Sequence, residues 1–378
     1  MGLIKNCLIV GGGIGGMCAA IELAKRGVEV ELVEINPDWN AAGAGITLGG
    51  ATLRALRQVG VVDEVLAHGG YWSEIDICAA DGTVLRTNPL EHAVGAEDLP
   101  AASGILRPAL ADILRRATER AGVKVRVGVT FNTLAQDVAG VNVCLTDGSS
   151  GRYDLVIGAD GVNSKVREVV FPDAPAPRFT GQGSWRAIVP RTRRNSTILM
   201  GETTKAGLNP VSDTQGYLFL LDKRAGMEFL ELQTWPHLLA GLLEEFGGAV
   251  KEFREKLQDG GDLSSCSIVY RPLAGLMVPG PWHKGRVVLL GDTVHATTPH
   301  LAMGAGIAVE GAVVLAEELF RCHSLEGSLI SYAGRRYDRA RLVVSSSLRL
   351  GEIEQYGGSR DEHYEVMAHA MHELTLPI

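Results

Sequence analysis

The chain has 378 residues, of which 46% are hydrophobic and 21% are charged, and its formal net charge is −8. This composition is typical of a globular protein, and the negative charge argues against nucleic-acid binding and against a basic membrane-surface protein. No apolar run approaches the ~20 residues of a transmembrane helix, so we expect no membrane segment. The six cysteines are scattered without a C-x-x-C pair. Their arrangement favours reduced thiols in a cytoplasmic protein and predicts no metal site.

The first 34 residues predict a β-α-β unit. A short apolar strand at residues 7–10 leads into GGGIGG at residues 11–16, which a helix over 17–26 and a strand over 28–33 follow. The glycines fit G-x-G-x-x-G, in which the backbone turns tightly and approaches a pyrophosphate at the helix N-terminus. Glu34 ends the second strand, where a carboxylate can bind both hydroxyls of a ribose. We therefore expect the adenosine of FAD or NAD here, with a structural glycine turn as the alternative.

The following elements are predicted in chain order. Residues 50–60, 62–67 and 108–120 have helical patterns, residues 75–85 form a hairpin, and strands cover 123–127, 130–135, 141–145 and 154–157. After Pro172 the pattern changes to alternating strands near 184–189, 197–200, 217–221 and 228–233, followed by one helical stretch over 236–257. A buried strand over 286–290 and a long helix over 304–320 then repeat the pattern of buried strands and helices that the chain shows before Pro172. The first domain is therefore expected to be interrupted by a second one.

Two of these strands end in an acidic turn. The strand at 154–157 leads into Asp160-Gly161, which alone could be an ordinary Asp-Gly turn. The strand at 286–290 ends in Gly291-Asp292, and a glycine-bearing helix start follows at 304–306. A carboxylate there can accept hydrogen bonds from the polyol chain of a flavin, and the positive helix end can face the flavin pyrimidine.

In this order and spacing, the three motifs resemble those of the single-component FAD-dependent aromatic hydroxylases, the family of the para-hydroxybenzoate and salicylate hydroxylases. The resemblance extends from residue 3 to about residue 345. The loop PHLAMGAG at 299–306 is similar to that of salicylate hydroxylase and 6-hydroxynicotinate monooxygenase. Met303, Gly311 and the segment 291–295 depart from the common pattern. These departures concern the substrate and the flavin environment more than FAD binding.

The resemblance and the order of elements together predict an α/β fold, in which a Rossmann-like FAD-binding domain is interrupted by an α+β substrate domain with an antiparallel sheet. We assign residues 1–72, 100–172 and 281–345 to the discontinuous FAD-binding domain. Residues 73–99 and 173–280 form the predicted substrate-binding domain, and residues 346–378 form a C-terminal helical tail.

The resemblance implies which residues hold FAD. The glycine loop and Glu34 would hold the adenosine end, Arg107 the phosphate–ribityl region and Asp292 the ribityl chain. Asp160 and Gly161 belong to a motif linked to both FAD and NAD(P)H, and Arg107 could by itself equally be a surface ion pair. The predicted cofactor-binding residues are Gly11, Gly13, Ile14, Gly15, Gly16, Glu34, Arg107, Asp160, Gly161, Asp292, Gly304, Ala305 and Gly306.

Two residues are predicted to be catalytic. His300 follows Pro299 and precedes the helix near Gly304, so we expect its imidazole to face the substrate and to accept the proton of the substrate hydroxyl. The alternative is that His300 caps the helix. Tyr217 is expected on the opposite wall, unless it is a packed aromatic of the sheet.

Four further residues are weaker substrate candidates, namely Thr47, Trp185, Lys205 and Pro299. Trp185 could equally pack in a core. Lys205 lies where some relatives carry an anion-binding Arg, but a solvated side chain is the alternative.

The resemblance also implies a reaction. NADH or NADPH reduces FAD, dioxygen forms a flavin C4a-hydroperoxide, and one oxygen atom passes to a small phenolic or hydroxypyridine-type aromatic. The expected partners are this substrate and dioxygen, without nucleic acid or membrane, in a monomer or homodimer. A dehydrogenase or reductase on the same scaffold would not consume dioxygen. A nucleotide-binding protein without flavin is the other alternative, against which Gly291-Asp292 argues.

Overall fold

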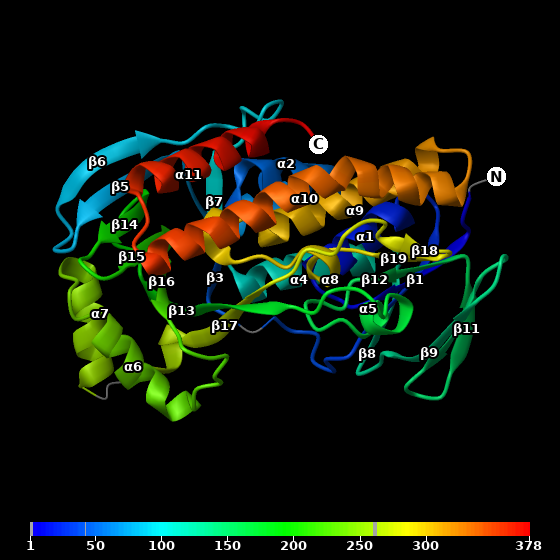
Figure 1. The fold of residues 1–378 in the computed structure, drawn as a ribbon, viewed down its shortest axis with the longest axis horizontal. Helices are drawn as coiled ribbons and strands as arrows, with labels where there is room; N and C mark the ends of the chain where they lie inside the picture. The colour runs from blue at the N-terminus through cyan, green and yellow to red at the C-terminus, as the bar shows by residue number, and fades with distance from the viewer. Residues whose placement is uncertain (1–2, 42, 260–262) are drawn as a thin grey trace.

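The computed structural model describes residues 3–41, 43–259 and 263–378, and two large sheets organise it (Figure 1). The first is a six-stranded sheet in the order β18-β19-β12-β1-β2-β8, parallel except for β18 at its edge. Its strands are β1 (Asn6–Val10), β2 (Glu29–Glu34), β8 (Lys124–Val127), β12 (Leu155–Gly158), β18 (His283–Lys284) and β19 (Val287–Leu289). Residues 7–10 of the central β1 are all buried, which explains why this strand is continuously apolar. The predicted β-α-β unit is confirmed.

Helices pack around this sheet and against one another. Helix α1 (Ile14–Ala24) packs against α9 (Gly304–Arg321), and α9 packs against the long α10 (Leu325–Tyr356) (Figure 1). The predicted helices over 50–60, 62–67, 108–120 and 304–320 are confirmed. They are α2 (Gly50–Val59), α3 (Val62–His68), α4 (Arg107–Arg120) and α9.

The second large sheet has seven strands in the order β17-β13-β16-β15-β14-β5-β6. Its neighbouring strands pair antiparallel, except for the parallel pair β14–β5. The strands are β5 (Glu74–Ala79), β6 (Val84–Pro89), β13 (Arg178–Pro190), β14 (Ser196–Met200), β15 (Lys205–Pro210), β16 (Gln215–Lys223) and β17 (Val269–Gly275). One face carries a core with α6 (Trp235–Leu242) and α7 (Gly248–Gln258). The domain boundaries at residues 72, 99, 172 and 280 stay a prediction.

Two small sheets complete the architecture. The sheet of β3 (Gly45–Gly49), β7 (Ala102–Leu106) and β4 (Gly70–Trp72) contacts β13 and β15 of the seven-stranded sheet. It also contacts α2, α4 and α9, the last of which packs on α1. The strands β9 (Phe131–Gln136), β10 (Val141–Leu145) and β11 (Ser150–Tyr153) form an antiparallel sheet.

Two predicted elements differ from the structure, and one strand of the seven-stranded sheet was not predicted. The strand expected near 228–233 is irregular and ends in a 3-10 turn at Leu232–Thr234, with Phe229 and Leu232 exposed. The single helix over 236–257 is two helices, because the chain reverses at Gly247 and Gly248, where Gly248 has φ +55°. Strand β15 was not predicted, since its sequence KAGLNP contains a glycine and a proline that are typical of loops.

The predicted boundary between residues 345 and 346 falls inside α10, which is continuous over Leu325–Tyr356, and the division into domains and tail stays a prediction. Helix α11 (Arg360–Thr375) follows and packs back on α10.

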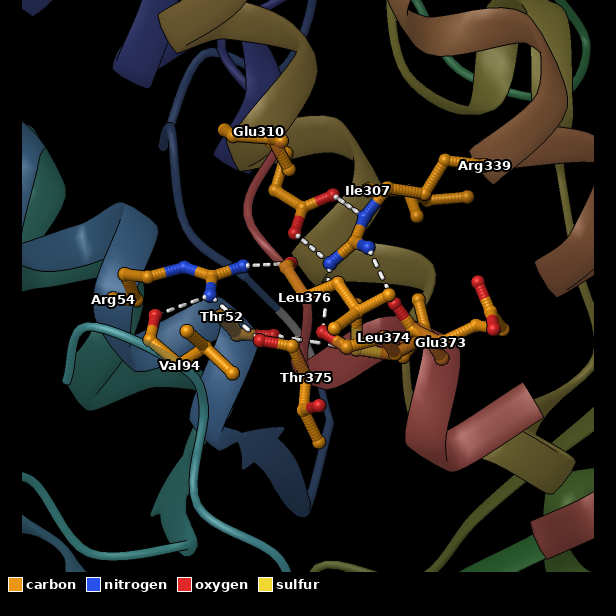
Figure 2. A network of polar contacts seen from close by, with 12 residues as sticks. Thr52, Arg54, Val94, Ile307, Glu310, Arg339, Glu373, Leu374, Thr375 and Leu376 are labelled. Carbon is orange, nitrogen blue, oxygen red and sulfur yellow. Dashed lines mark hydrogen bonds and ion pairs between the residues drawn. The ribbon is translucent and has the colours of Figure 1, made fainter. Parts of the chain in front are cut away.

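Buried charges hold the end of the chain in place, as Figure 2 shows. Arg54 donates hydrogen bonds to the carbonyl oxygens of Thr375 (2.8 Å) and Leu376 (2.7 Å). Arg339 donates to the carbonyl of Leu374 at 2.8 Å and to the fully buried carboxylate of Glu310. These arginines connect the C-terminal residues with α2, α9 and α10. None of the helices in the described ranges is both long and apolar enough to cross a membrane.

Candidate active site

The loop between β1 and α1 is shaped by close backbone contacts. Gly11 has φ +109°, and a Cβ atom there would lie 2.3 Å from the carbonyl oxygen of Ala159. A Cβ atom on Gly16 would lie 2.0 Å from the carbonyl oxygen of Gly11, and one on Gly15 would lie 3.3 Å from the Cβ of Ala308 on α9. Gly11 and Gly16 therefore allow α1 to approach the strand ends, and Gly15 allows α9 to pack on the loop.

Gly13 differs from these glycines because a Cβ atom there would meet no atom within 4 Å. Gly13 is also the N-cap of α1, which begins at Ile14 with neither a capping side chain nor an acidic residue in its first turn. The positive end of α1 therefore has no capping side chain and has open space beside Gly13, where a phosphate can bind.

Glu34 lies beside this loop. Its Oε2 accepts a hydrogen bond from the backbone N–H of Gly12 at 2.7 Å, and its Oε1 accepts one from that of Asn36 at 2.8 Å. Each carboxylate oxygen has capacity for a further hydrogen bond, so Glu34 can still bind two ribose hydroxyls.

Asp160 and Gly161 shape the neighbouring turn. Asp160 accepts hydrogen bonds from the Ser164 hydroxyl and from the backbone N–H of Lys165, at 2.5 and 2.7 Å, so it caps α5 (Lys165–Val170). Gly161 provides φ +84°. The buried Arg167 on α5 then donates to the carbonyl oxygen of Thr293 at 2.9 Å. This motif is thus connected to the residue that follows Asp292.

Asp292 begins α8 (Asp292–His295). Desolvation by the surrounding protein raises the pKa of its carboxyl, and the charge of Arg107 partly opposes this effect. The side chain nevertheless has an exposed surface. A carboxyl group that is surrounded by protein but still accessible can bind a ligand, and we call the site defined by Asp292 and Arg107 the flavin recess.

Arg107 is the first residue of α4, and its side chain forms no hydrogen bond or ion pair with any residue that the structure describes. Desolvation and then the positive charge of Arg186 lower the pKa of Arg107, while the charge of Asp292 opposes them. The two residues of the flavin recess are therefore electrostatic neighbours, and the cation remains free to bind a ligand.

Residues 304–306 begin α9 close to the recess. Its N-cap, Met303, supplies no capping side chain, and no acidic residue lies in the first turn. A Cβ atom on Gly291 would lie 3.4 Å from that of Ala308, so the segment before Asp292 meets the first turns of α9. The positive end of α9 is therefore available to a ligand in the recess.

These features fit FAD. An anion site at α1, a carboxylate for the ribose at Glu34, and a cation and a carboxylate in the flavin recess are what this cofactor requires along its length.

The predicted substrate residue Thr47 on β3 contacts Tyr217 on β16. Their hydroxyl oxygens lie 2.5 Å apart, and the side-chain N–H of Asn209 donates to Thr47 at 2.8 Å. Tyr217 is buried, with a side chain that packs over Gly45, where a Cβ atom would lie 2.1 Å from its ring. Tyr217 thus has protein partners on its hydroxyl and its ring.

His300 and Lys205 are brought together by Glu354, a residue of α10 that sequence reasoning missed. Lys205 Nζ lies 2.5 Å from Glu354 Oε1, and His300 Nε2 lies 3.4 Å from Oε2, beyond good hydrogen-bond geometry. His363 Nε2 is 3.0 Å from Oε1, and the Thr298 hydroxyl is 2.8 Å from His300 Nδ1. The His300 side chain is only 1% exposed.

Burial would raise the pKa of the Glu354 carboxyl, but the nearby imidazole of His300, the hydrogen bond from His363 and the charge of Lys205 outweigh burial and lower it. Glu354 is therefore a carboxylate that neutralises basic groups from three other parts of the chain.

Trp185 and Pro299 have different surroundings. Trp185 is fully buried in the core beneath α6 and α7, with its ring centroid 4.7 Å from that of Tyr270. It packs on the sheet face away from β3 and β7, as its core-packing alternative predicts. Pro299 begins the half-buried turn Pro299–Leu301 that carries His300.

Comparisons with known proteins agree with this arrangement. A family model described as an FAD binding domain matches residues 5–347. Aurachin C monooxygenase/isomerase of Stigmatella aurantiaca is 31% identical over 92% of this chain and 89% of that protein. 6-hydroxynicotinate 3-monooxygenase of Bordetella bronchiseptica is 29% identical over 81% of this chain and 80% of that protein. The structure of Klebsiella pneumoniae HpxO with FAD and uric acid has the same fold, with a TM-score of 0.80 at 23% identity over 98% of this chain and 92% of that one.

Proposed function

This chain belongs to the FAD binding domain family, with FAD as its cofactor, and from that premise we propose that it is a monooxygenase that uses NADH or NADPH and dioxygen to hydroxylate a small phenolic or hydroxypyridine-type aromatic. The observation that carries the proposal is a set of groups without side-chain partners among the described residues: the α1 and α9 N-termini, Arg107 and the accessible Asp292. The relatives named above support oxygen-consuming chemistry over a dehydrogenase.

The residues around the recess would bind and orient the cofactor. Glu34 would accept hydrogen bonds from the ribose hydroxyls, the α1 N-terminus would bind the pyrophosphate, and Asp292 would hold the ribityl hydroxyls. The uncapped N-terminus of α9 would stabilise negative charge on the reduced ring. When bound, FAD supplies hydride acceptance from the nicotinamide and the activation of dioxygen.

His300 and Tyr217 remain the proposed substrate-side residues. Glu354 can stabilise the imidazolium that forms when His300 accepts a proton, since its carboxylate lies 3.4 Å from Nε2. Tyr217 would act through its hydroxyl group, which is hydrogen-bonded to the Thr47 hydroxyl and to the side-chain N–H of Asn209. Asp160 and Gly161 would help to bind both FAD and NAD(P)H. They shape the turn before α5, and Arg167 on α5 connects this turn to Thr293 by a hydrogen bond.

We also propose a cytoplasmic location, which the six free thiols support, and a monomer or homodimer as the active form.

The purified FAD-loaded protein tests this function. NADH and NADPH oxidation, dioxygen consumption and product mass are measured against a panel of phenols and hydroxypyridines. A monooxygenase consumes one dioxygen for each product that gains one oxygen atom. Product formation without dioxygen would instead identify a dehydrogenase or reductase.

A further inference from the structure

One face of the seven-stranded sheet carries a cation beside an aromatic ring. Trp185 and Ala187 on β13 point into the core beneath α6 and α7, so Arg186 between them points to the opposite face. Arg186 is paired across the sheet with Phe219 on β16, and Phe219 is paired with Gly207 on β15. Directly paired residues share a face, so these three form one row.

The glycine in this row determines how the ring lies. A Cβ atom on Gly207 would lie 2.0 Å from the Cζ atom of Phe219, so the ring rests over the backbone of β15. Phe219 is half-buried, its ring centroid lies 5.6 Å from that of Tyr217, and it packs against the same small buried cluster as Leu106. Tyr217 packs over Gly45, and Gly45 is paired across β3 and β7 with Leu106, which directly precedes Arg107, so the row lies on the sheet face toward the flavin recess.

Arg186 has no partner for its charge. It is half-buried, and it forms no hydrogen bond or ion pair with any residue in the described part of the chain. Its positive charge reaches Arg107, whose ionised form it disfavours. Lys205, which comes from the same face, is already paired with Glu354. A half-buried guanidinium without an anionic partner among the described residues, whose charge also acts on a second guanidinium, is an unfavourable arrangement that a bound carboxylate would relieve.

We propose that Arg186 binds the carboxylate of an anionic aromatic substrate whose ring lies against Phe219. The inference rests on the proposed function and specifies its substrate class. The planar guanidinium can donate two parallel hydrogen bonds to a carboxylate, and the ring of Phe219 offers a flat apolar surface for a planar ligand. A neutral ring of the same shape would leave Arg186 unpaired and would bind more weakly.

Binding to the FAD-loaded protein tests the proposal independently of turnover. Dissociation constants are measured from the change in flavin absorbance for two matched pairs, benzoate with benzamide and salicylate with salicylamide. We expect each carboxylate to bind at least about 10-fold more tightly than its amide. Arg186→Gln should abolish this preference without changing amide binding, and Arg186→Lys should retain part of it. Arg178→Gln, at the exposed start of β13, is the control and should keep it.

Equal affinities for acid and amide in the unmodified protein would overturn the proposal, whether or not the variants fold. So would an Arg186→Gln variant that keeps the preference, or one that instead weakens only NADPH in anaerobic flavin reduction, because Arg186 would then serve the reductant. These outcomes are separate from failure of the proposed function. If the protein preferred carboxylates but never consumed dioxygen, the carboxylate site at Arg186 would be supported and the proposed monooxygenase function would be wrong.

Discussion

The cofactor side and the substrate side of this protein differ in how their polar groups are satisfied. Around the β1–α1 loop and the flavin recess, the groups predicted to bind FAD face open space or lack partners, as Gly13 and Arg107 show. On the substrate side, the predicted residues are already paired with other parts of the chain, as Lys205 is with Glu354 and Tyr217 with Thr47.

The difference shows how a ligand site can be distinguished from a structural cluster. A polar group that the fold leaves without a partner is stabilised when a ligand binds to it. A group that is already paired with another residue gains little from a ligand. By this criterion Arg186 is a better candidate than Lys205 for a residue that binds the substrate. The following substitutions test the contrast, from the largest expected effect to the smallest.

Within the glycine loop, Gly16→Ala should have the largest effect. Its methyl group would lie 2.0 Å from the carbonyl oxygen of Gly11, so α1 must shift, at a cost of about 3 kcal/mol of unfolding free energy and with loss of FAD. The matched variant Gly13→Ala meets no protein atom within 4 Å. It should keep the stability of the apoprotein and weaken only FAD binding. Urea unfolding and flavin titration measure the two quantities, and equal stability losses in both variants would contradict the contrast.

His300→Ala should lower substrate turnover by roughly 10²-fold, because a proton acceptor is removed. FAD content should stay unchanged, and the pH profile of turnover should shift. Steady-state kinetics over a range of pH values measures this effect, with the exposed His372→Ala on α11 as the control. Turnover within about twofold of the unmodified protein at every pH would show that His300 is only part of the buried cluster.

Glu354→Gln should remove about 2 kcal/mol of stability at neutral pH, because a carboxylate that receives charge-assisted hydrogen bonds is lost. The pKa of Glu354 is lowered in the folded protein. Its contribution is therefore present above the ordinary value of 4.5 and is lost as the pH falls below it toward the folded value. The loss of stability in acid should be shallower in the variant, as urea unfolding at several pH values would show.

Glu352→Gln is the matched control for this variant. Glu352 lies on the same helix, and its one ion pair within the described ranges is an exposed one with Arg349, which contributes little stability. If both variants lost the same stability, the contacts of Glu354 with Lys205 and His363 would not stabilise the fold as described.

Ala302→Gly should have the smallest effect and the opposite sign. Ala302 has φ +51°, a left-handed conformation that costs a residue with a side chain about 1 kcal/mol. Glycine removes most of this strain, so thermal unfolding should show a gain of at most about 1 kcal/mol. Ala368→Gly in the exposed part of α11 should instead lose about that amount. A loss at both positions would mean that the turn before α9 tolerates alanine without strain.

Much of the site followed from local sequence. The order strand, glycine loop, helix, strand and Glu34 predicted the β-α-β unit, and Gly291-Asp292 predicted an acidic strand end beside a helix start. Residues that act only through distant contacts gave no such signal. Glu354 lies at position 30 of a 32-residue helix, and nothing near it in the sequence indicates Lys205 or His300 as partners.

The sequence by itself determined the elements whose signals are local: continuous apolar strands, glycine turns with defined φ angles, and helix ends without acidic caps. Only the tertiary structure decided which polar groups remain without a partner. Arg186 and Lys205 are both basic residues on strands of one sheet, and the sequence does not distinguish them. Lys205 is neutralised by Glu354 on α10, whereas Arg186 is neutralised by no described residue. The difference arises because α10 packs over one end of that sheet face. Electrostatic pairing depends on distance in space, which is fixed only when helices and sheets far apart in the chain pack together.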